Sequence, residues 1–314
     1  MNRTRLLFVL LTLLALARPA FAVDKLTVIL DWFINPDHGP IFVAQELGYF
    51  AAAGLEVTII APADANDPPK LVAAGRADLA VSYQPQLYML VGEGLPLRRV
   101  GTLVATPLNS LVVLADGPVK SIADLKGKRI GYSVAGFEDT MLKAMLRTHG
   151  LALTDVQLVN VNFALTPALL SGQVAGVIGA FRNFELTELA MLGKSGRAFY
   201  PEEEGVPAYD ELIFVAHESR VSDPKIKAFL GAIEQAVQAM INRPQETWPL
   251  FIKGDRKHLD DELNRRAWTD TLPRFAHSPA ALDRNRYERF AAFMQAEGLI
   301  KTALPVERYA VEVR

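Results

Sequence analysis

The amino-acid sequence predicts an α/β protein of two lobes, in which each lobe is a mainly parallel sheet flanked by helices and the chain crosses twice between them. Three observations predict this fold. Short β-rich runs alternate with helical patterns, the alternation restarts after Asn109, and 314 residues exceed what one core usually holds. The predicted division gives residues 23–107 and 212–314 to lobe 1 and residues 108–211 to lobe 2.

The first 22 residues predict a cleaved signal peptide. Arg3 and Arg5 precede an apolar run of about a dozen residues, and a small-x-small sequence, Ala-Phe-Ala, ends at residue 22. The apolar run is shorter than the roughly 20 residues that span a bilayer. Removal of this segment would leave 292 residues and, because three arginines go with it, would move the formal charge from −2 to −5.

Charge and cysteine content limit the classes of partner and the kinds of site that the chain can have. An acidic chain without a basic patch does not favour nucleic acid, so we expect a small-molecule ligand and a monomer. Cysteine is absent, which excludes disulfides, a thiol nucleophile and the lipid-bearing cysteine of a lipoprotein. These features predict a periplasmic protein that is not a lipoprotein.

In lobe 1 four short apolar runs predict strands. They are residues 25–30, 55–60, 77–82 and 98–104, and the first is followed by a helical pattern that starts near Pro40.

Lobe 2 repeats the alternation of predicted strands and helices. Strands are expected at residues 110–115, 128–134, 156–162 and 175–181, with a helix at 138–149 and the stretch TPALLSGQ before the last strand. After a further strand near residues 211–219, the pattern turns helical over residues 223–244, with Asp223 and Pro224 as cap and first turn. The crossings therefore fall near residues 104–110 and 206–216.

Four loops follow the carboxyl ends of predicted strands, where open parallel sheets bind ligands. They are residues 30–40, 82–87, 131–139 and 179–185. In the first, Trp32 offers a stacking face and His38 a polar contact, although a capped helix with Trp32 in the core fits the same pattern. Gly136 lies in a loop whose backbone N–H groups could meet an anionic or carbonyl group. Glu185 is either an acceptor for a ligand donor or a solvated glutamate at a helix start.

Catalytic and metal motifs are not found. The sequence has five histidines but no H-E-x-x-H, no pair at metal spacing and no G-x-S-x-G. We therefore expect no metal site and no cofactor.

Several stretches together carry a family resemblance. They read LDWFINPDHGPIFVAQELGYF, GLEVTIIAP, LVAAGRADLAVS, SIADLKGKRIGYS and GVPAYDELIFVA. The chain resembles periplasmic substrate-binding proteins of ABC importers, in the branch related to thiamine-pyrimidine synthases and formylaminopyrimidine-binding proteins. The resemblance covers roughly residues 24–240. It implies a fold that closes on a thiamine-precursor pyrimidine, either formylaminopyrimidine or hydroxymethylpyrimidine, and then docks on a membrane permease.

The same resemblance, together with the chemistry of the ligand that it implies, gives a set of predicted ligand-binding residues. They are Trp32, His38, Tyr83, Gln84, Asn109, Gly136, Phe137 and Glu185. A flat heteroaromatic ring would stack on Trp32 or Tyr83, and Glu185 would accept from a ring amino group. Asn109 or the loop that holds Gly136 and Phe137 would donate to a formamide or hydroxyl.

One kind of relative in this family is a synthase that uses pyridoxal phosphate and consumes its own histidine. The resemblance places its lysine and histidine where this chain has Ser82 and Gln86, and its cysteine-rich segment has no counterpart here. We therefore expect that the chain is not an enzyme. An alternative ligand within the same fold is an alkanesulfonate, a nitrate or an aromatic acid, for which Arg182 is the cationic candidate.

Overall fold

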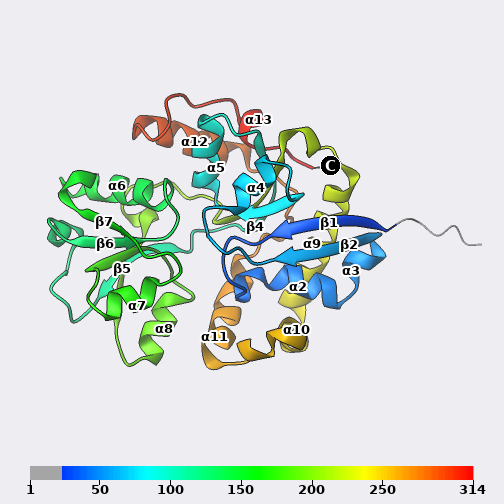
Figure 1. Ribbon diagram of the computed structural model, residues 1–314, viewed down its shortest axis with the longest axis horizontal. Coiled ribbons are helices and arrows are strands. Elements are labelled where there is room, and N and C mark those ends of the chain that lie inside the picture. The colour runs from blue at the N-terminus through cyan, green and yellow to red at the C-terminus, as the bar shows by residue number, and fades with distance from the viewer. Residues whose placement is uncertain (1–22, 314) are drawn as a thin grey trace, which may run out of the picture.

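The computed structural model describes residues 23–313. They fold into two five-stranded sheets, each flanked by helices (Figure 1). They lie side by side along the long axis of the molecule. We call the part built on the first sheet the first unit and the part built on the second sheet the second unit. The predicted signal peptide, residues 1–22, lies outside the described residues.

The first sheet has the strand order β2-β1-β3-β10-β4. Its strands are β1 (Asp24–Ile29), β2 (Leu55–Ile60), β3 (Leu79–Ser82), β4 (Leu97–Val104) and β10 (Leu212–His217). Strand β1 pairs in parallel with β2 and β3, whereas β10 runs antiparallel to both β3 and β4. Four of the five strands therefore run in one direction.

The second sheet repeats this arrangement in the order β7-β6-β8-β5-β9. Its strands are β5 (Asn109–Leu114), β6 (Arg129–Tyr132), β7 (Gln157–Asn160), β8 (Gly176–Phe181) and β9 (Gly196–Phe199). Strand β6 is parallel to β7 and β8, and β5 is antiparallel to β8 and β9. In each sheet the reversed strand, β10 or β5, is the first that follows a crossing from the other unit.

Helices cover the faces of both sheets (Figure 1). The α-helices are α2 (Gly39–Glu46), α3 (Tyr49–Ala52), α4 (Pro68–Ala73), α5 (Gln84–Gly92), α6 (Glu138–Thr148), α7 (Leu165–Leu170), α8 (Glu185–Met191), α9 (Pro224–Asn242), α10 (Pro244–Phe251), α11 (Glu262–Thr271), α12 (Arg284–Ala296) and α13 (Val306–Tyr309). Short 3-10 turns are η1 (Pro36–His38), η2 (Ile122–Leu125), η3 (Leu153–Asp155), η4 (Pro201–Glu203), η5 (Glu218–Arg220), η6 (Gly254–Leu259) and η7 (Leu272–Arg274). The predicted α/β fold with mainly parallel sheets is confirmed.

Helix α9 shows why the sequence pattern identified its start. The Asp223 carboxylate accepts a hydrogen bond from the Lys225 backbone N–H at 3.0 Å, and Pro224 occupies the first turn, where its missing N–H costs nothing. The helix buries one apolar face against the first sheet and α2. Among residues 23–313 no helix has the length and apolar character to cross a membrane.

Two segments connect the units. The chain leaves β4 at Val104 and enters β5 at Asn109, then leaves β9 at Phe199 and enters β10 at Leu212. The assignment of residues 23–107 and 212–314 to one lobe and 108–211 to the other stays a prediction.

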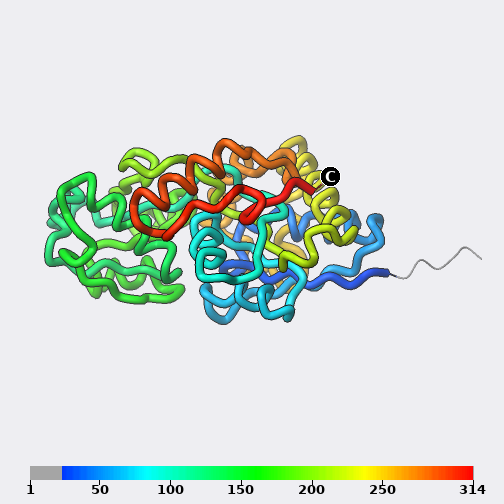
Figure 2. Tube along the Cα trace, turned by 90° about the horizontal axis from the view of Figure 1, so that it is seen from above, coloured from blue at the N-terminus to red at the C-terminus, as the bar shows by residue number. Residues whose placement is uncertain are grey.

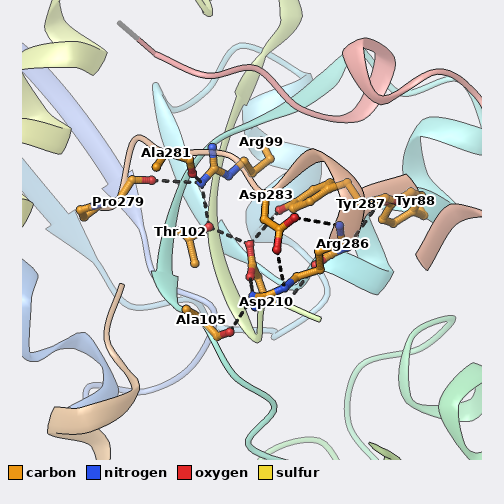
Figure 3. Close-up of polar contacts among 11 residues, drawn as sticks. Tyr88, Arg99, Thr102, Ala105, Asp210, Pro279, Ala281, Asp283, Arg286 and Tyr287 are labelled. Atoms are coloured by element: carbon orange, nitrogen blue, oxygen red, sulfur yellow. Dashed lines mark hydrogen bonds and ion pairs between the residues drawn. The ribbon is translucent and has the colours of Figure 1, made fainter. Parts of the chain in front are cut away.

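A buried polar network holds the two crossings together (Figure 3). Arg286 of α12 donates to the Ala105 carbonyl oxygen in the first crossing, at 2.8 Å, and forms an ion pair with Asp210 in the second. Asp210 also accepts from the hydroxyl groups of Thr102 and Tyr287, at 2.8 and 3.2 Å. One side chain of α12 thus contacts both connections.

Helix α12 also reaches the second unit. Arg147 of α6 donates twice to the Glu297 carboxylate, at 2.7 Å each, and Lys143 Nζ donates to the Glu297 carbonyl oxygen at 3.0 Å. Figure 2 shows the orange and red C-terminal trace lying along the molecule from the first unit towards the second. The C-terminal segment therefore packs on both units.

Candidate functional site

A cavity lies between the two units, and residues of both units line it. About 20 Å³ of it is open to the centre of a water-sized molecule, within about 400 Å³ of space free of protein atoms that includes open solvent. The lining residues are Asp31, Trp32, Asn35, Asp37, Tyr83, Glu138, Gly179, Phe181, Phe184 and Glu185. Each comes from the carboxyl-terminal part of β8 or from a segment that follows the carboxyl end of β1, β3, β6 or β8, which is where open parallel sheets bind ligands.

The segment between β1 and α2 is shaped by its own polar side chains. Asn35 Oδ1 accepts from the Asp37 N–H at 2.8 Å, while the Asn35 N–H donates to His38 Nδ1 at 3.3 Å. Because Nδ1 accepts, the other ring nitrogen of His38 carries the proton and donates to Asp31 Oδ1 at 2.9 Å. The hydroxyl group of Tyr83 donates to the second oxygen of Asp31 at 2.7 Å. Asp31 is therefore fixed between His38 and Tyr83.

Aromatic rings in and around the cavity join the units. Trp32 meets Phe163 edge to face with ring centres 4.6 Å apart, and Tyr83 stacks on Phe137 at 4.9 Å. Phe33 contacts Phe163 and Phe184 at 6.2 and 6.0 Å. Each of these pairs combines one residue of the first unit with one of the second, so the rings stabilise the closed arrangement.

Three buried carboxyl groups keep acceptor capacity towards the cavity. Asp37, Glu138 and Glu185 are only 2, 3 and 8% exposed. Glu138 accepts from the Ser133 N–H and Glu185 from the Phe181 N–H, each at 2.6 Å. No side chain of residues 23–313 donates to either glutamate. A carboxylate has about four lone-pair directions, so further donors can be accommodated.

Asp37 is held differently. Asn183 Nδ2 and the Thr271 hydroxyl group donate to the same oxygen, Oδ1, at 2.7 and 2.8 Å. Its other oxygen has no hydrogen bond within the described part of the chain. Asn183 belongs to the second unit, so this carboxyl group also connects the two sides of the cavity.

Burial changes the protonation of these groups. Loss of hydration raises the pKa of Glu138 and of Glu185 to about 8, and that of Asp37 to about 6. Hydrogen bonds from backbone N–H groups oppose this effect at both glutamates but do not cancel it. The empty cavity therefore favours neutral carboxyl groups over part of the neutral pH range.

The raised pKa values predict that the ligand-free protein loses stability as pH rises. A carboxyl group with a raised pKa in the folded state stabilises the fold fully below its unfolded pKa of about 4.5, and this contribution is lost as pH rises through about 8. One pKa unit corresponds to about 1.4 kcal/mol, so each glutamate changes the free energy of unfolding by on the order of a few kcal/mol. Denaturant titrations at pH 5, 7 and 9 measure this slope.

Glutamine variants test whether the carboxyl groups of the cavity cause the change of the free energy of unfolding with pH. Glu185→Gln is expected to lose less stability than the wild type between pH 5 and 9, because the amide does not ionise. Glu188→Gln, on the same helix but outside the cavity lining, should keep most of the wild-type slope, because burial and not the charge of Glu188 is the main cause of the raised pKa of Glu185. Equal slopes in the wild type and Glu185→Gln would contradict the prediction.

Of the eight residues predicted to bind ligand, three line the cavity: Trp32, Tyr83 and Glu185. His38 is fully buried behind Asp31. Gln84 is buried too, and its Oε1 accepts from the Asp210 N–H at 2.8 Å.

The other three lie around the cavity without lining it. Asn109 Oδ1 accepts from the Gly179 N–H at 3.0 Å, and its Nδ2 is buried without a partner among the described residues. Phe137 backs Tyr83, and Gly136 lies beside Met89 with φ +80°. All eight assignments to ligand binding stay predictions.

Seven lining residues were not predicted. They are Asp31, Asn35, Asp37, Glu138, Gly179, Phe181 and Phe184. One signal was available, because a glycine inside an apolar strand indicates a bulge or a close approach. Gly179 has φ +99°, and a Cβ atom there would lie 2.3 Å from Glu138 Oε1.

No lysine, arginine or histidine is among the lining residues that the structure describes. Arg182, the cation expected for an anionic ligand, lies elsewhere. It pairs with Glu202, with Nη2 and Oε2 3.0 Å apart, and its guanidinium lies 4.1 Å from the Tyr200 ring centre. It also donates to the Asn109 carbonyl oxygen at 3.1 Å. Its charge is therefore already compensated.

Ser82 and Gln86, the positions that the resemblance connects with synthase chemistry, contact each other. The Ser82 hydroxyl group donates to Gln86 Oε1 at 2.8 Å, and both side chains are buried. No group of histidine, aspartate or glutamate residues within 23–313 is arranged to hold a metal ion.

Comparison with known proteins identifies relatives. The family model described as NMT1/THI5 like matches residues 35–247. A protein of Haemophilus influenzae, named for thiamine biosynthesis, is 55% identical over 96% of each chain. A formylaminopyrimidine-binding protein of Halalkalibacterium halodurans is 36% identical over 72% of this chain and 69% of its own. The predicted resemblance is confirmed.

Solved structures agree on the fold. The alkanesulfonate-binding protein of Xanthomonas axonopodis pv. citri superposes with a TM-score of 0.72 at 16% identity, over 94% of this chain and 99% of that one. A Candida albicans protein described as having the generic periplasmic binding protein fold gives 0.73 at 18% identity, over 93 and 97%. The fold is that of periplasmic binding proteins.

One prediction needs correction, namely that the chain is not an enzyme. A 4-amino-5-hydroxymethyl-2-methylpyrimidine phosphate synthase of Schizosaccharomyces pombe is 27% identical over 84% of this chain and 79% of its own. Further relatives carry the same enzyme name. The exclusion was therefore wrong, because sequences that align over most of this chain include named enzymes.

Proposed function

This chain belongs to the NMT1/THI5-like family, and from that premise we propose that it is a solute-binding receptor for a thiamine-precursor aminopyrimidine. The ligand is formylaminopyrimidine or hydroxymethylpyrimidine, captured between the two units in the periplasm and delivered to the membrane permease of an ABC importer. The location rests on the predicted signal peptide in residues 1–22 and on the absence of cysteine.

The observation that carries the proposal is the composition of the cavity. Trp32 and Tyr83 offer flat aromatic faces to a pyrimidine ring. Asp37, Glu138 and Glu185 offer acceptors to its amino group and ring substituents, and the set has no cation that would favour a sulfonate or carboxylate ligand.

Both units supply lining residues, and this supports capture by closure. A ligand that contacts Trp32 on one side and Glu185 on the other binds the closed state better than an open one, so it shifts the population towards closure. The network at the crossings supplies the structural link about which the units would move.

Mass spectrometry of the small molecules released from freshly purified full-length protein tests the proposal. We expect an aminopyrimidine, and we expect added 4-amino-5-hydroxymethyl-2-methylpyrimidine to raise the melting temperature. Stabilisation by alkanesulfonates or aromatic acids and not by aminopyrimidines would replace this ligand class by the anionic one.

The same samples address catalysis, which the synthase relatives make a second candidate. Recovery of the added pyrimidine unchanged after incubation supports a receptor. A converted or newly formed pyrimidine would identify enzymatic activity.

A further inference from the structure

We propose that the cavity selects the unphosphorylated form of its aminopyrimidine and that Glu138 enforces this selection. The inference rests on the proposed function and adds a discrimination to it. The question arises because several relatives are named pyrimidine phosphate synthases, so a phosphorylated pyrimidine is the natural competitor.

Glu138 is built into the wall of the cavity. It is the first residue of α6, is 3% exposed, and lies against the backbone of β8 at Gly179. Any side chain at Gly179 would meet the Glu138 carboxyl group, because a Cβ atom there would lie 2.3 Å from Oε1. The close approach of glycine and carboxyl group fixes where this carboxyl group faces the ligand, as a neutral group below about pH 8 and as an anion above it.

Glu138 also occupies the place where a phosphate would bind. Backbone N–H groups at the start of a helix commonly hold phosphate. Here the N–H groups of Ser133 and Val134 point to the Glu138 carboxylate, with Ser133 N at 2.6 Å. The next N–H, of Ala135, donates to Asn66 Oδ1 at 2.9 Å. Three successive donors of the loop before α6 are therefore already taken.

No compensating charge is present for a phosphate. The described lining residues include Asp31, Asp37, Glu138 and Glu185 but no cationic side chain. Arg182, which directly follows the lining residue Phe181 in sequence, is paired with Glu202. Above about pH 8, where Glu138 and Glu185 are ionised, a phosphate ester would thus bring a dianion against carboxylates, whereas an amino or hydroxymethyl group would donate to them.

Calorimetric titration of the full chain at pH 9, where Glu138 is ionised, with 4-amino-5-hydroxymethyl-2-methylpyrimidine and with its phosphate ester tests the inference. In the wild type we expect the alcohol to bind at least about 100-fold more tightly than the phosphate, because juxtaposed like charges cost several kcal/mol. Inorganic phosphate should not compete with the alcohol.

Glu138→Gln assigns the discrimination to this residue. The amide oxygen can keep the Ser133 N–H bond, so the NH₂ group faces the cavity and the negative charge is lost. We expect the ratio of the two dissociation constants to fall at least about tenfold. Asp139→Asn, the same charge change one residue away and outside the cavity lining, should change the ratio far less, because burial and not the charge of Asp139 is the main cause of the raised pKa of Glu138.

The ratio of the two dissociation constants separates selection by Glu138 from a merely structural role, because a structural defect would weaken the binding of both ligands equally. Glu138→Asp keeps the charge and should keep the ratio, so it tests the inference even if Glu138→Gln does not fold. Equal affinity of the wild type for both forms, or an unchanged ratio in a folded Glu138→Gln, would overturn the inference alone. Binding of neither form would overturn the proposed function as well.

Discussion

Glu185→Gln is expected to weaken the binding of 4-amino-5-hydroxymethyl-2-methylpyrimidine about 30- to 150-fold. Glu185 Oε2 accepts the Phe181 N–H at 2.6 Å, so a glutamine must turn its oxygen to that N–H and its NH₂ group to the cavity. The glutamine NH₂ group, a donor, then faces the ligand amino group in place of the Glu185 carboxyl oxygen, an acceptor. Leaving such buried groups unpaired costs about 2–3 kcal/mol, which corresponds to the stated factor.

Calorimetry on the wild type and two variants checks this expectation. Glu188→Gln is the matched control, since it makes the same change on α8 outside the cavity lining, and it should bind within about twofold of the wild type. A folded Glu185→Gln protein with wild-type affinity would remove Glu185 from the binding site.

Arg99→Ala is expected to lower the free energy of unfolding by at least about 3 kcal/mol. Arg99 has no exposed surface, and its guanidinium donates to the carbonyl oxygens of Pro279, Ala280, Ala281 and Val311 and to the Thr102 hydroxyl group. Truncation leaves several buried acceptors without a donor, each at a cost of about 1–3 kcal/mol. It also leaves a cavity in the packing behind β4.

Guanidinium denaturation of the variant measures the loss, and the preceding residue supplies the control. Arg98 lies on the partly exposed face of β4 and pairs with Glu218 at 3.4 Å. Arg98→Ala should therefore cost no more than about 1 kcal/mol. If the two alanine variants were equally stable, the buried network around Arg99 would not hold the C-terminal segment as described.

The sequence patterns located most strands because apolar runs bounded by turns mark buried strands well. The run 55–60 coincides with β2, and 98–104 lies within β4. Strand β9 was not predicted, because Gly196–Phe199 is short and only half-buried. The reversed direction of β5 and β10 could not be read either, since side-chain alternation is the same in both directions.

The candidate site was only partly predictable for a related reason. Trp32, Tyr83 and Glu185 follow strands that the pattern located, so their position at the cavity could be expected. Glu138 looked like an ordinary acidic residue at a helix start, where it would stabilise the helix from solvent. Its inward orientation depends on Gly179, which is far away in sequence.

His38 shows that a residue in the predicted loop need not line the cavity. It lies in the predicted loop, but the turn η1 directs its ring away from the cavity and onto Asp31. Loop position alone does not determine the direction of a side chain, because capping interactions such as that of Asn35 set the local backbone.

The contacts of Arg286 have a mechanical consequence. Two separate connections would let the units twist relative to each other as well as bend. One guanidinium binds Ala105 in the first connection and Asp210 in the second, so the two connections are tied to each other and to helix α12. We therefore expect any movement of the cavity wall that carries Glu185 relative to the wall that carries Trp32 to involve both connections together.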